Sequence, residues 1–229
     1  MMLQIPAWLL TASEVLEWVS QLSVLVPLAI AWRRRTLFAP TVRVLFWYTY
    51  LSLFTSLALQ IGRHLFHLNT PVQHLYTLLK TLLFGRMYYL ALRRPWHRQL
   101  VYGLTLGFAG FAALDAFYLE GLTHFNSYGR AVQSLLLIGF AMLYFEQMLR
   151  ELRVSRLEQD PLFLASVGLV IYSAGTGMLF VLINNFRESL SALTLAFDTV
   201  SLLNIAFNVL LTFAFLRAHP SEVEQSHQG

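Results

Sequence analysis

The sequence predicts an all-α fold, a polytopic membrane protein with seven transmembrane helices. The 229 residues are 57% hydrophobic and only 12% charged, with a mean hydropathy of +0.58. An ordinary soluble domain carries about twice that share of charge. A bilayer core about 30 Å thick needs roughly 20 apolar residues per helix. Seven stretches of about that length follow one another with short links, which leaves no room for a soluble domain.

The first three predicted spans are interrupted by charged residues. They cover residues 13–32, 44–65 and 73–92. Glu14 and Glu17 lie in the opening turns of the first span, but residues 22–32 are strongly apolar. The third span begins after Asn69-Thr70-Pro71 and contains Lys80, the only lysine of the chain, and Arg86. We nevertheless expect all three to cross the membrane.

The last four predicted spans are more apolar. They cover residues 99–119, 128–149, 161–184 and 193–216. In the fourth, Gly103, Gly107 and Gly110 have the small-xxx-small spacing that lets helices approach closely, within one chain or between two. The sixth has three glycines, which makes it the most readily kinked span. In the seventh, Asn204 and Asn208 lie four residues apart and are expected to form interhelical hydrogen bonds.

Basic residues predict the orientation. Eleven arginines lie in alternate links or at the chain's C-terminal end, against three in the opposite links, Arg63, Arg130 and Arg187. Cationic loops stay in the cytoplasm, so we expect the N-terminus outside and the C-terminus inside a bacterial inner membrane. Trp32, Trp47 and Trp96 fall at the proposed inner boundary, where indoles prefer to lie. Residues 1–216 then form the bundle, and residues 217–229 form a disordered cytoplasmic tail.

Polar side chains concentrate toward the outer side. Ionisable groups within spans usually face the bundle interior, pair, or mark a site. They predict either an outward-facing pocket for a small polar or anionic ligand or an ion, or a buried network of ion pairs. We further expect Lys80 to pair with Asp115 or Asp198. The candidate ligand-binding residues are Glu14, Glu17, Gln60, Arg63, His64, His74, Lys80, Asp115, Arg130 and Asp198.

The inner half is predicted to be a closed, aromatic core. The residues expected to plug it are Phe84, Tyr88, Phe140, Tyr144 and Phe213. No nucleophile with an adjacent base stands out, which disfavours an enzyme. Four histidines lie in or near the outer third, but no HExxH motif is present and the chain has no cysteine. We therefore expect no metal and no cofactor. The basic residues flank membrane spans, which also disfavours nucleic-acid binding.

Two short stretches resemble a class of small seven-helix bacterial membrane proteins of uncharacterised function, often encoded beside sensor histidine kinases. The stretches are Asn69-Thr70-Pro71 followed by His74-Leu75-Tyr76-Thr77, and Asp160-Pro161-Leu162-Phe163 leading to Tyr172-Ser173. The resemblance implies a signalling role through a separate protein, such as a histidine kinase. We therefore expect a sensor of a small ligand or ion. A transporter or channel is the alternative, followed by a lipid-modifying enzyme.

Overall fold

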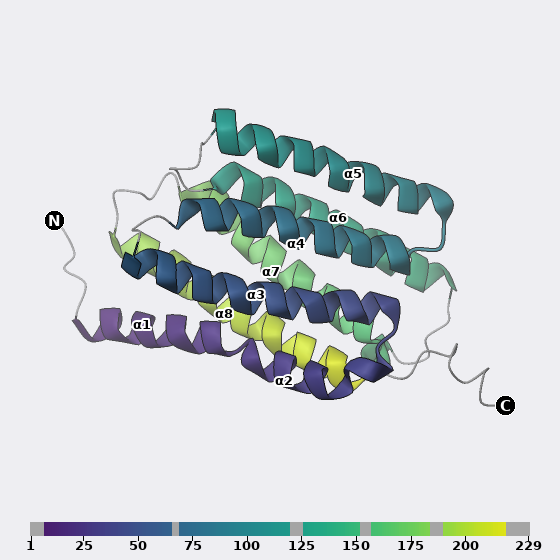
Figure 1. Cartoon of the computed structure of the whole chain (residues 1–229), viewed down its shortest axis with the longest axis horizontal. Helices are drawn as coiled ribbons and strands as arrows, with labels where there is room; N and C mark the ends of the chain where they lie inside the picture. The colour runs from purple at the N-terminus through teal and green to yellow at the C-terminus, as the bar shows by residue number, and fades with distance from the viewer. Residues whose placement is uncertain (1–6, 66–68, 120–125, 152–156, 184–189, 219–229) are drawn as a thin grey trace.

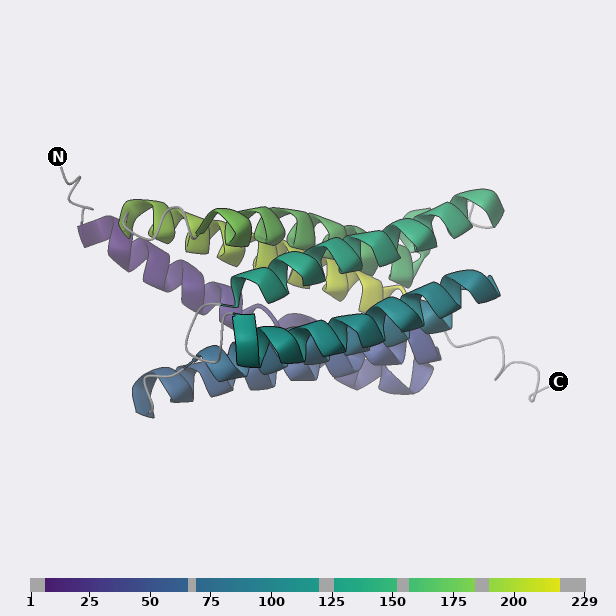
Figure 2. The same ribbon diagram turned by 90° about the horizontal axis from the view of Figure 1, so that it is seen from above.

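The computed structural model describes residues 7–65, 69–119, 126–151, 157–183 and 190–218, and these are helical with no strand (Figure 1). The long helices lie side by side in an elongated bundle (Figures 1 and 2). The α-helices are α1 (Ala7–Leu22), α2 (Leu25–Arg34), α3 (Pro40–Leu65), α4 (Thr70–Ala91), α5 (Pro95–Leu114), α6 (Ser127–Glu151), α7 (Pro161–Ile183) and α8 (Leu190–Leu216). Short 3-10 turns follow α2 and precede α7, and a π-helical turn, Asp115–Leu119, extends α5.

Six of the described segments are long and apolar enough to cross a membrane. They are residues 11–37, 40–62, 95–118, 127–150, 161–180 and 192–216. Large apolar side chains on the outer surface, such as Phe54, Leu135 and Met178, are about 70% exposed, as expected for a surface in contact with lipid. The chain is therefore a multi-pass membrane protein.

Helix α4 is the exception among the predicted spans. Its 22 residues run beside the other helices and pack against α3, α5 and α6. It is not among the six apolar segments, because Gln73, His74, Lys80 and Arg86 interrupt its hydrophobic residues. Two of these polar side chains face the interior of the bundle, since His74 and Lys80 are both more than 90% buried.

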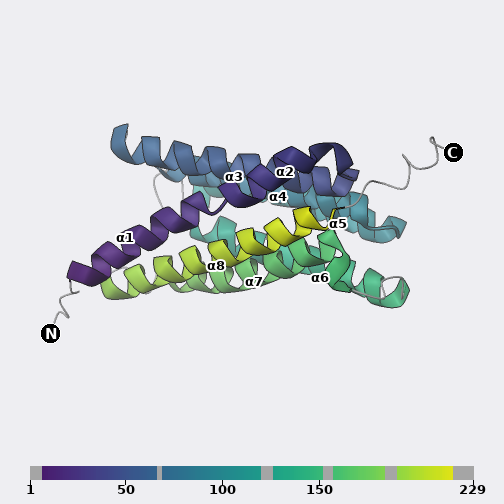
Figure 3. The same ribbon diagram turned by 90° about the horizontal axis from the view of Figure 1, so that it is seen from below.

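The first predicted span is broken where α1 meets α2 (Figure 3). Pro27 has no amide hydrogen to donate to the carbonyl of Ser23, and this carbonyl instead accepts a hydrogen bond from the Val26 N–H at 3.3 Å. The Ser23 hydroxyl donates to the carbonyl of Ser20 at 2.7 Å. The glycine-rich span that we expected to be the most readily kinked, α7, is continuous. Its glycines serve close packing instead, because a Cβ on Gly168 would lie 2.8 Å from the Phe207 ring of α8.

The small-residue stripe of α5 does not mediate packing within the described structure. A Cβ added to Gly103, Gly107 or Gly110 would meet no atom within 4 Å, so of the two alternatives the described structure does not contain the contact within one chain. Helices α4 and α5 instead approach closely at Gly85, where an added Cβ would lie 2.8 Å from Cγ2 of Thr105.

The aromatic core is largely as predicted. Phe84, Tyr88 and Phe140 are at most 1% exposed, and Tyr144 is 6% exposed. Phe213 contradicts the prediction, because it is 46% exposed and lies on the outer surface of α8. The buried face of α8 holds Phe207, Leu211, Ala214 and Phe215. Their spacing of four, three and one residues defines one helical stripe from which Phe213 points away.

The two ends of the bundle differ in charge. We call the end where α2 and α8 finish the basic end, and the end where α1 begins the polar end. Nine described arginines gather at the basic end: Arg33, Arg34, Arg35, Arg43, Arg93, Arg94, Arg98, Arg150 and Arg217. Arg34 also donates hydrogen bonds to the carbonyls of Phe215 and Leu216, which joins α2 to the last turn of α8. Residues 219–229 of the predicted tail lie outside the described residues.

Candidate functional site

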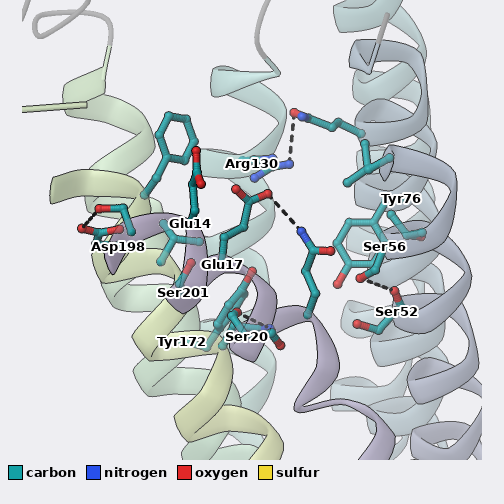
Figure 4. A pocket seen from close by; sticks show the side chains of 18 of the residues that line it. Glu14, Glu17, Ser20, Ser52, Ser56, Tyr76, Arg130, Tyr172, Asp198 and Ser201 are labelled. Carbon is teal, nitrogen blue, oxygen red and sulfur yellow. Dashed lines mark hydrogen bonds between the residues drawn. The ribbon is translucent and has the colours of Figure 1, made fainter. Parts of the chain in front are cut away.

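A partly open cavity of about 540 Å³ lies in the polar half of the bundle (Figure 4). Side chains from α1, α3, α4, α6, α7 and α8 line it, so it depends on the packing of helices far apart in the sequence. The break between α1 and α2 lies beside it, since Ser20 and Gln21 at the end of α1 belong to its lining.

One wall of the cavity is acidic. Glu14 and Glu17 come from α1 and Asp198 comes from α8. The Ser13 hydroxyl donates to Oδ2 of Asp198 at 2.8 Å, and Gln21 Nε2 donates to Oε1 of Glu17 at 3.0 Å. Hydrogen-bond donors on α1 therefore orient two of the three carboxylates.

Arg130 of α6 supplies the cation on another wall (Figure 4). Its Nη2 donates to Oε1 of Gln73 at 3.2 Å, and its guanidinium carbon lies 4.3 Å from the centre of the Phe180 ring. No described carboxylate lies within the 4 Å of an ion pair. The guanidinium is thus held in place by neutral groups, and most of its N–H donors remain available to a ligand.

Hydroxyl groups of α3 form a wall that we did not predict. Ser52, Thr55 and Ser56 all line the cavity. Their spacing of three and four residues places them on one helical face, which could have been recognised in the sequence. Gln60 continues this polar face but is not part of the lining, because its Nε2 donates to Oε1 of Gln21 at 2.9 Å.

The seventh predicted span carries the interhelical amides that we expected. Asn204 Nδ2 lies 3.0 Å from the Ser20 hydroxyl, and Asn208 Nδ2 donates to the Ser23 hydroxyl at 2.7 Å. Both bonds join α8 to the first predicted span. Asn204 also lines the cavity.

Lys80 is not part of this cavity, and the ion pair predicted for it is wrong. Its Nζ lies 4.1 Å from the centre of the Tyr172 ring and 5.9 Å from those of Tyr48 and Tyr76. No described carboxylate lies within ion-pair distance. Helix α4 directs Lys80 toward α3 and α7. Of the two expected partners, Asp115 lies beside His74 and Asp198 accepts a hydrogen bond from Ser13.

Asp115 and His74 form a separate buried pair. His74 Nδ1 lies 3.7 Å from Oδ2 of Asp115, and the two residues are 8% and 0% exposed. Neither lines the cavity. Asn126 lies in the same region and donates to the Thr77 hydroxyl at 3.1 Å. This pair therefore lies where α4, the end of α5 and the start of α6 meet.

The side chains of two further candidates, Arg63 and His64, lie outside the described residues, as do His67 and His124. Within the part of the chain that is described, no three His, Cys, Asp or Glu side chains form a group suited to a metal ion. Of the ten candidate residues, the cavity brings together Glu14, Glu17, Arg130 and Asp198.

An extended ion-pair network is not what holds the described bundle together. The ion pairs formed between described side chains are His74 with Asp115 and Arg150 with Glu146, and the second is an exposed pair within α6. In the cavity, Glu17, Asp198 and Arg130 instead form hydrogen bonds with neutral side chains. Comparison with known proteins found no matching family model, curated protein or solved structure.

Proposed function

We propose that this chain is a membrane sensor whose cavity binds a small charged solute from outside the cell and whose output passes through a separate protein. The observation that supports this most directly is the cavity itself. It has room for a molecule of about amino-acid size and has acidic, cationic and hydroxyl walls. A few placed polar groups in a concave site are typical of small-molecule binding.

The proposed orientation has the N-terminus outside and seven crossings, including α4. It rests on the gathering of arginines at the basic end, because cationic segments stay in the cytoplasm. The cavity then faces outward. A reporter fused after His219 should be active only in the cytoplasm.

The output is proposed to pass to a partner such as a histidine kinase, as the sequence resemblance implies. The arginines of the basic end offer a docking surface for it. Ligand would act by binding two arrangements of the helices with different affinities.

A sensor is favoured over a carrier because the cavity ends on packed aromatic rings. Tyr172 lines the cavity and stacks on Phe207 with ring centres 5.7 Å apart. Phe207 in turn contacts Tyr48 and Phe84, and all three are at most 2% exposed. A carrier must expose its site to both sides in turn, and these packed rings would have to separate for that to happen.

A transporter is the second candidate, and one observation favours it. The break in the first predicted span lies beside the cavity. Transporters commonly bind their substrates at interrupted helices. In that case the solute would move across the bundle, and the aromatic core would have to open during the cycle.

Cysteine accessibility separates the two functions, because the chain contains no cysteine. Ser56 lines the cavity, and Ser166 is 0% exposed in the basic half. We expect S56C to react with a membrane-impermeant thiol reagent added outside. A charged amino acid such as L-glutamate or L-lysine should slow this reaction, and R130Q should abolish the protection by an acidic probe.

The S166C variant is the matched test of the closed half. It should stay unreactive from both sides, in right-side-out and inverted vesicles, with and without the probes. Labelling of S166C from the inside that depends on the probe would show alternating access and would replace the sensor with the transporter. If no charged probe protects S56C, the cavity is not a binding site for this class of solute.

A further inference from the structure

Below the main cavity lies a second, smaller chamber, which we call the Lys80 chamber. Its volume is about 20 Å³, which is room for a single water-sized particle. Side chains from α4, α6 and α7 form its walls. Tyr76, Arg130 and Tyr172 line both spaces and therefore form the partition between them.

The Lys80 chamber has two cations and no acid in its described lining. The cations are Lys80 and Arg130, which line the same small space. The remaining lining residues are hydroxyl-bearing side chains, one amide and one phenyl ring. A carboxylate, which would normally compensate buried cations, is missing from this set.

Several of the hydroxyl groups are already used within their own helices. The hydroxyls of Thr77, Ser134 and Thr176 each donate to the carbonyl four residues earlier, at 2.7 to 2.8 Å. Gln133 Nε2 donates to the Thr77 carbonyl and the Thr81 hydroxyl. Four other lining residues have N–H or O–H donors that form no hydrogen bond in the described structure. They are Lys80, Arg130, Tyr172 and Ser173.

The Lys80 side chain has few polar contacts within the described structure. It is 2% exposed and forms neither a hydrogen bond nor an ion pair in the described structure. The tyrosine ring 4.1 Å from its Nζ stabilises the charge in part, but all three N–H donors of an ammonium group are left without an acceptor. A buried ammonium group without an acceptor is strongly destabilising, so an acceptor that enters the chamber from solution would stabilise the charged form of Lys80.

We propose that the Lys80 chamber binds a small monovalent inorganic anion, chloride, between the Lys80 ammonium and the Arg130 guanidinium. The volume excludes sulfate, phosphate and organic acids. Chloride is slightly larger than water, and the flexible Lys80 side chain can provide the difference. The anion would join α4, α6 and α7 behind the partition, and it would share Arg130 with the main cavity.

Thermal unfolding of the purified protein in detergent tests this proposal. Chloride is titrated against gluconate at constant ionic strength and pH, with tryptophan fluorescence as the readout. A ligand that binds only the folded state raises the Tm, and at ten times its Kd the expected rise is about 3 to 6 °C. Bromide should act like chloride, whereas sulfate should not. A wild-type Tm that does not change between gluconate and chloride would overturn the proposal.

The K80M variant should lose the chloride dependence and should be more stable than the wild type in gluconate, since it removes an uncompensated charge. R86Q is the matched control, because Arg86 is an exposed cation on the same helix outside the chamber. It should keep the full chloride response. Equal chloride responses in K80M and the wild type would contradict the assignment.

Chloride-35 NMR gives a direct measurement that does not depend on how well K80M folds. The wild-type protein should broaden the chloride line in a saturable way, and bromide should reverse the broadening. R86Q should behave in the same way. If the wild type produces no broadening that bromide reverses, the chamber does not bind chloride.

Discussion

The close contact between α4 and α5 predicts that Gly85→Ala destabilises the protein. The new Cβ would lie 2.8 Å from Cγ2 and 3.1 Å from Cβ of Thr105, and closer still to its Oγ1. Rotation of Thr105 cannot relieve this contact, because each rotamer places another atom near the same point. Its hydroxyl is also held by the carbonyl of Val101 at 2.7 Å. The two helices must therefore move apart.

The magnitude follows from two opposing terms. Overpacking a close contact costs about 1 to 3 kcal/mol, and replacing glycine by alanine within a helix returns about 0.5 to 1 kcal/mol. We expect a net loss of about 1 to 2 kcal/mol. At roughly 2 to 4 °C per kcal/mol for a chain of this size, the Tm in detergent falls by about 2 to 8 °C.

Two further variants test the cause of this loss. Gly107→Ala lies on α5 with nothing within 4 Å of the added Cβ, so it should leave the Tm unchanged or raise it slightly. Thr105→Ala should restore most of the stability of Gly85→Ala, with a coupling of at least about 1 kcal/mol in the double-mutant cycle. A Gly85→Ala protein as stable as the wild type, or purely additive losses in the cycle, would refute the steric reasoning.

Three polar side chains give further predictions, each measured as a change in Tm in detergent. Tyr88→Phe removes a buried hydrogen bond of 2.9 Å to the Ser166 hydroxyl and should lower the stability by about 1 to 2 kcal/mol. If Tyr88→Phe causes the same loss in a Ser166→Ala background, the loss does not come from this bond. Asp160→Ala removes a carboxylate that accepts two backbone N–H groups at the start of α7, at 2.7 and 2.9 Å. It should cost about 0.5 to 2 kcal/mol, and the Asn variant, which keeps an acceptor oxygen, should lose much less. Asn208→Ala removes the bond between α8 and Ser23 and should cost about 0.6 to 1.7 kcal/mol; no loss would show that this bond does not stabilise the contact.

The helices and most of the buried aromatic core could be predicted from the sequence. Runs of about 20 apolar residues and the arginines that flank them are local properties, and the hydrophobic cost of exposing such runs leaves few alternatives. Asn204 and Asn208 were also correctly interpreted, because an amide inside a span must find a hydrogen-bond partner on another helix. Phe213 was placed wrongly because the sequence shows which residues are apolar but not which side of α8 meets α7.

The partners of the polar side chains were decided by the tertiary structure. Seven predicted spans and several candidate acids allow many pairings for Lys80, and only the rotation of α4 about its axis selects the three tyrosine rings around it. The same rotation places His74 against Asp115 and leaves both outside the main cavity.

The sequence by itself determined that this protein is a helical, multi-pass membrane protein with polar groups concentrated in one half, because these features depend only on the order of apolar and charged residues. The tertiary structure decided that those groups divide into a solute-sized cavity, a small chamber around Lys80 and a buried pair at Asp115. The physical reason is that helix rotation and close approach are set by the packing of side chains from distant segments. Glycines such as Gly85 and Gly168 control that packing, and their role becomes visible only when the neighbouring helix is in place.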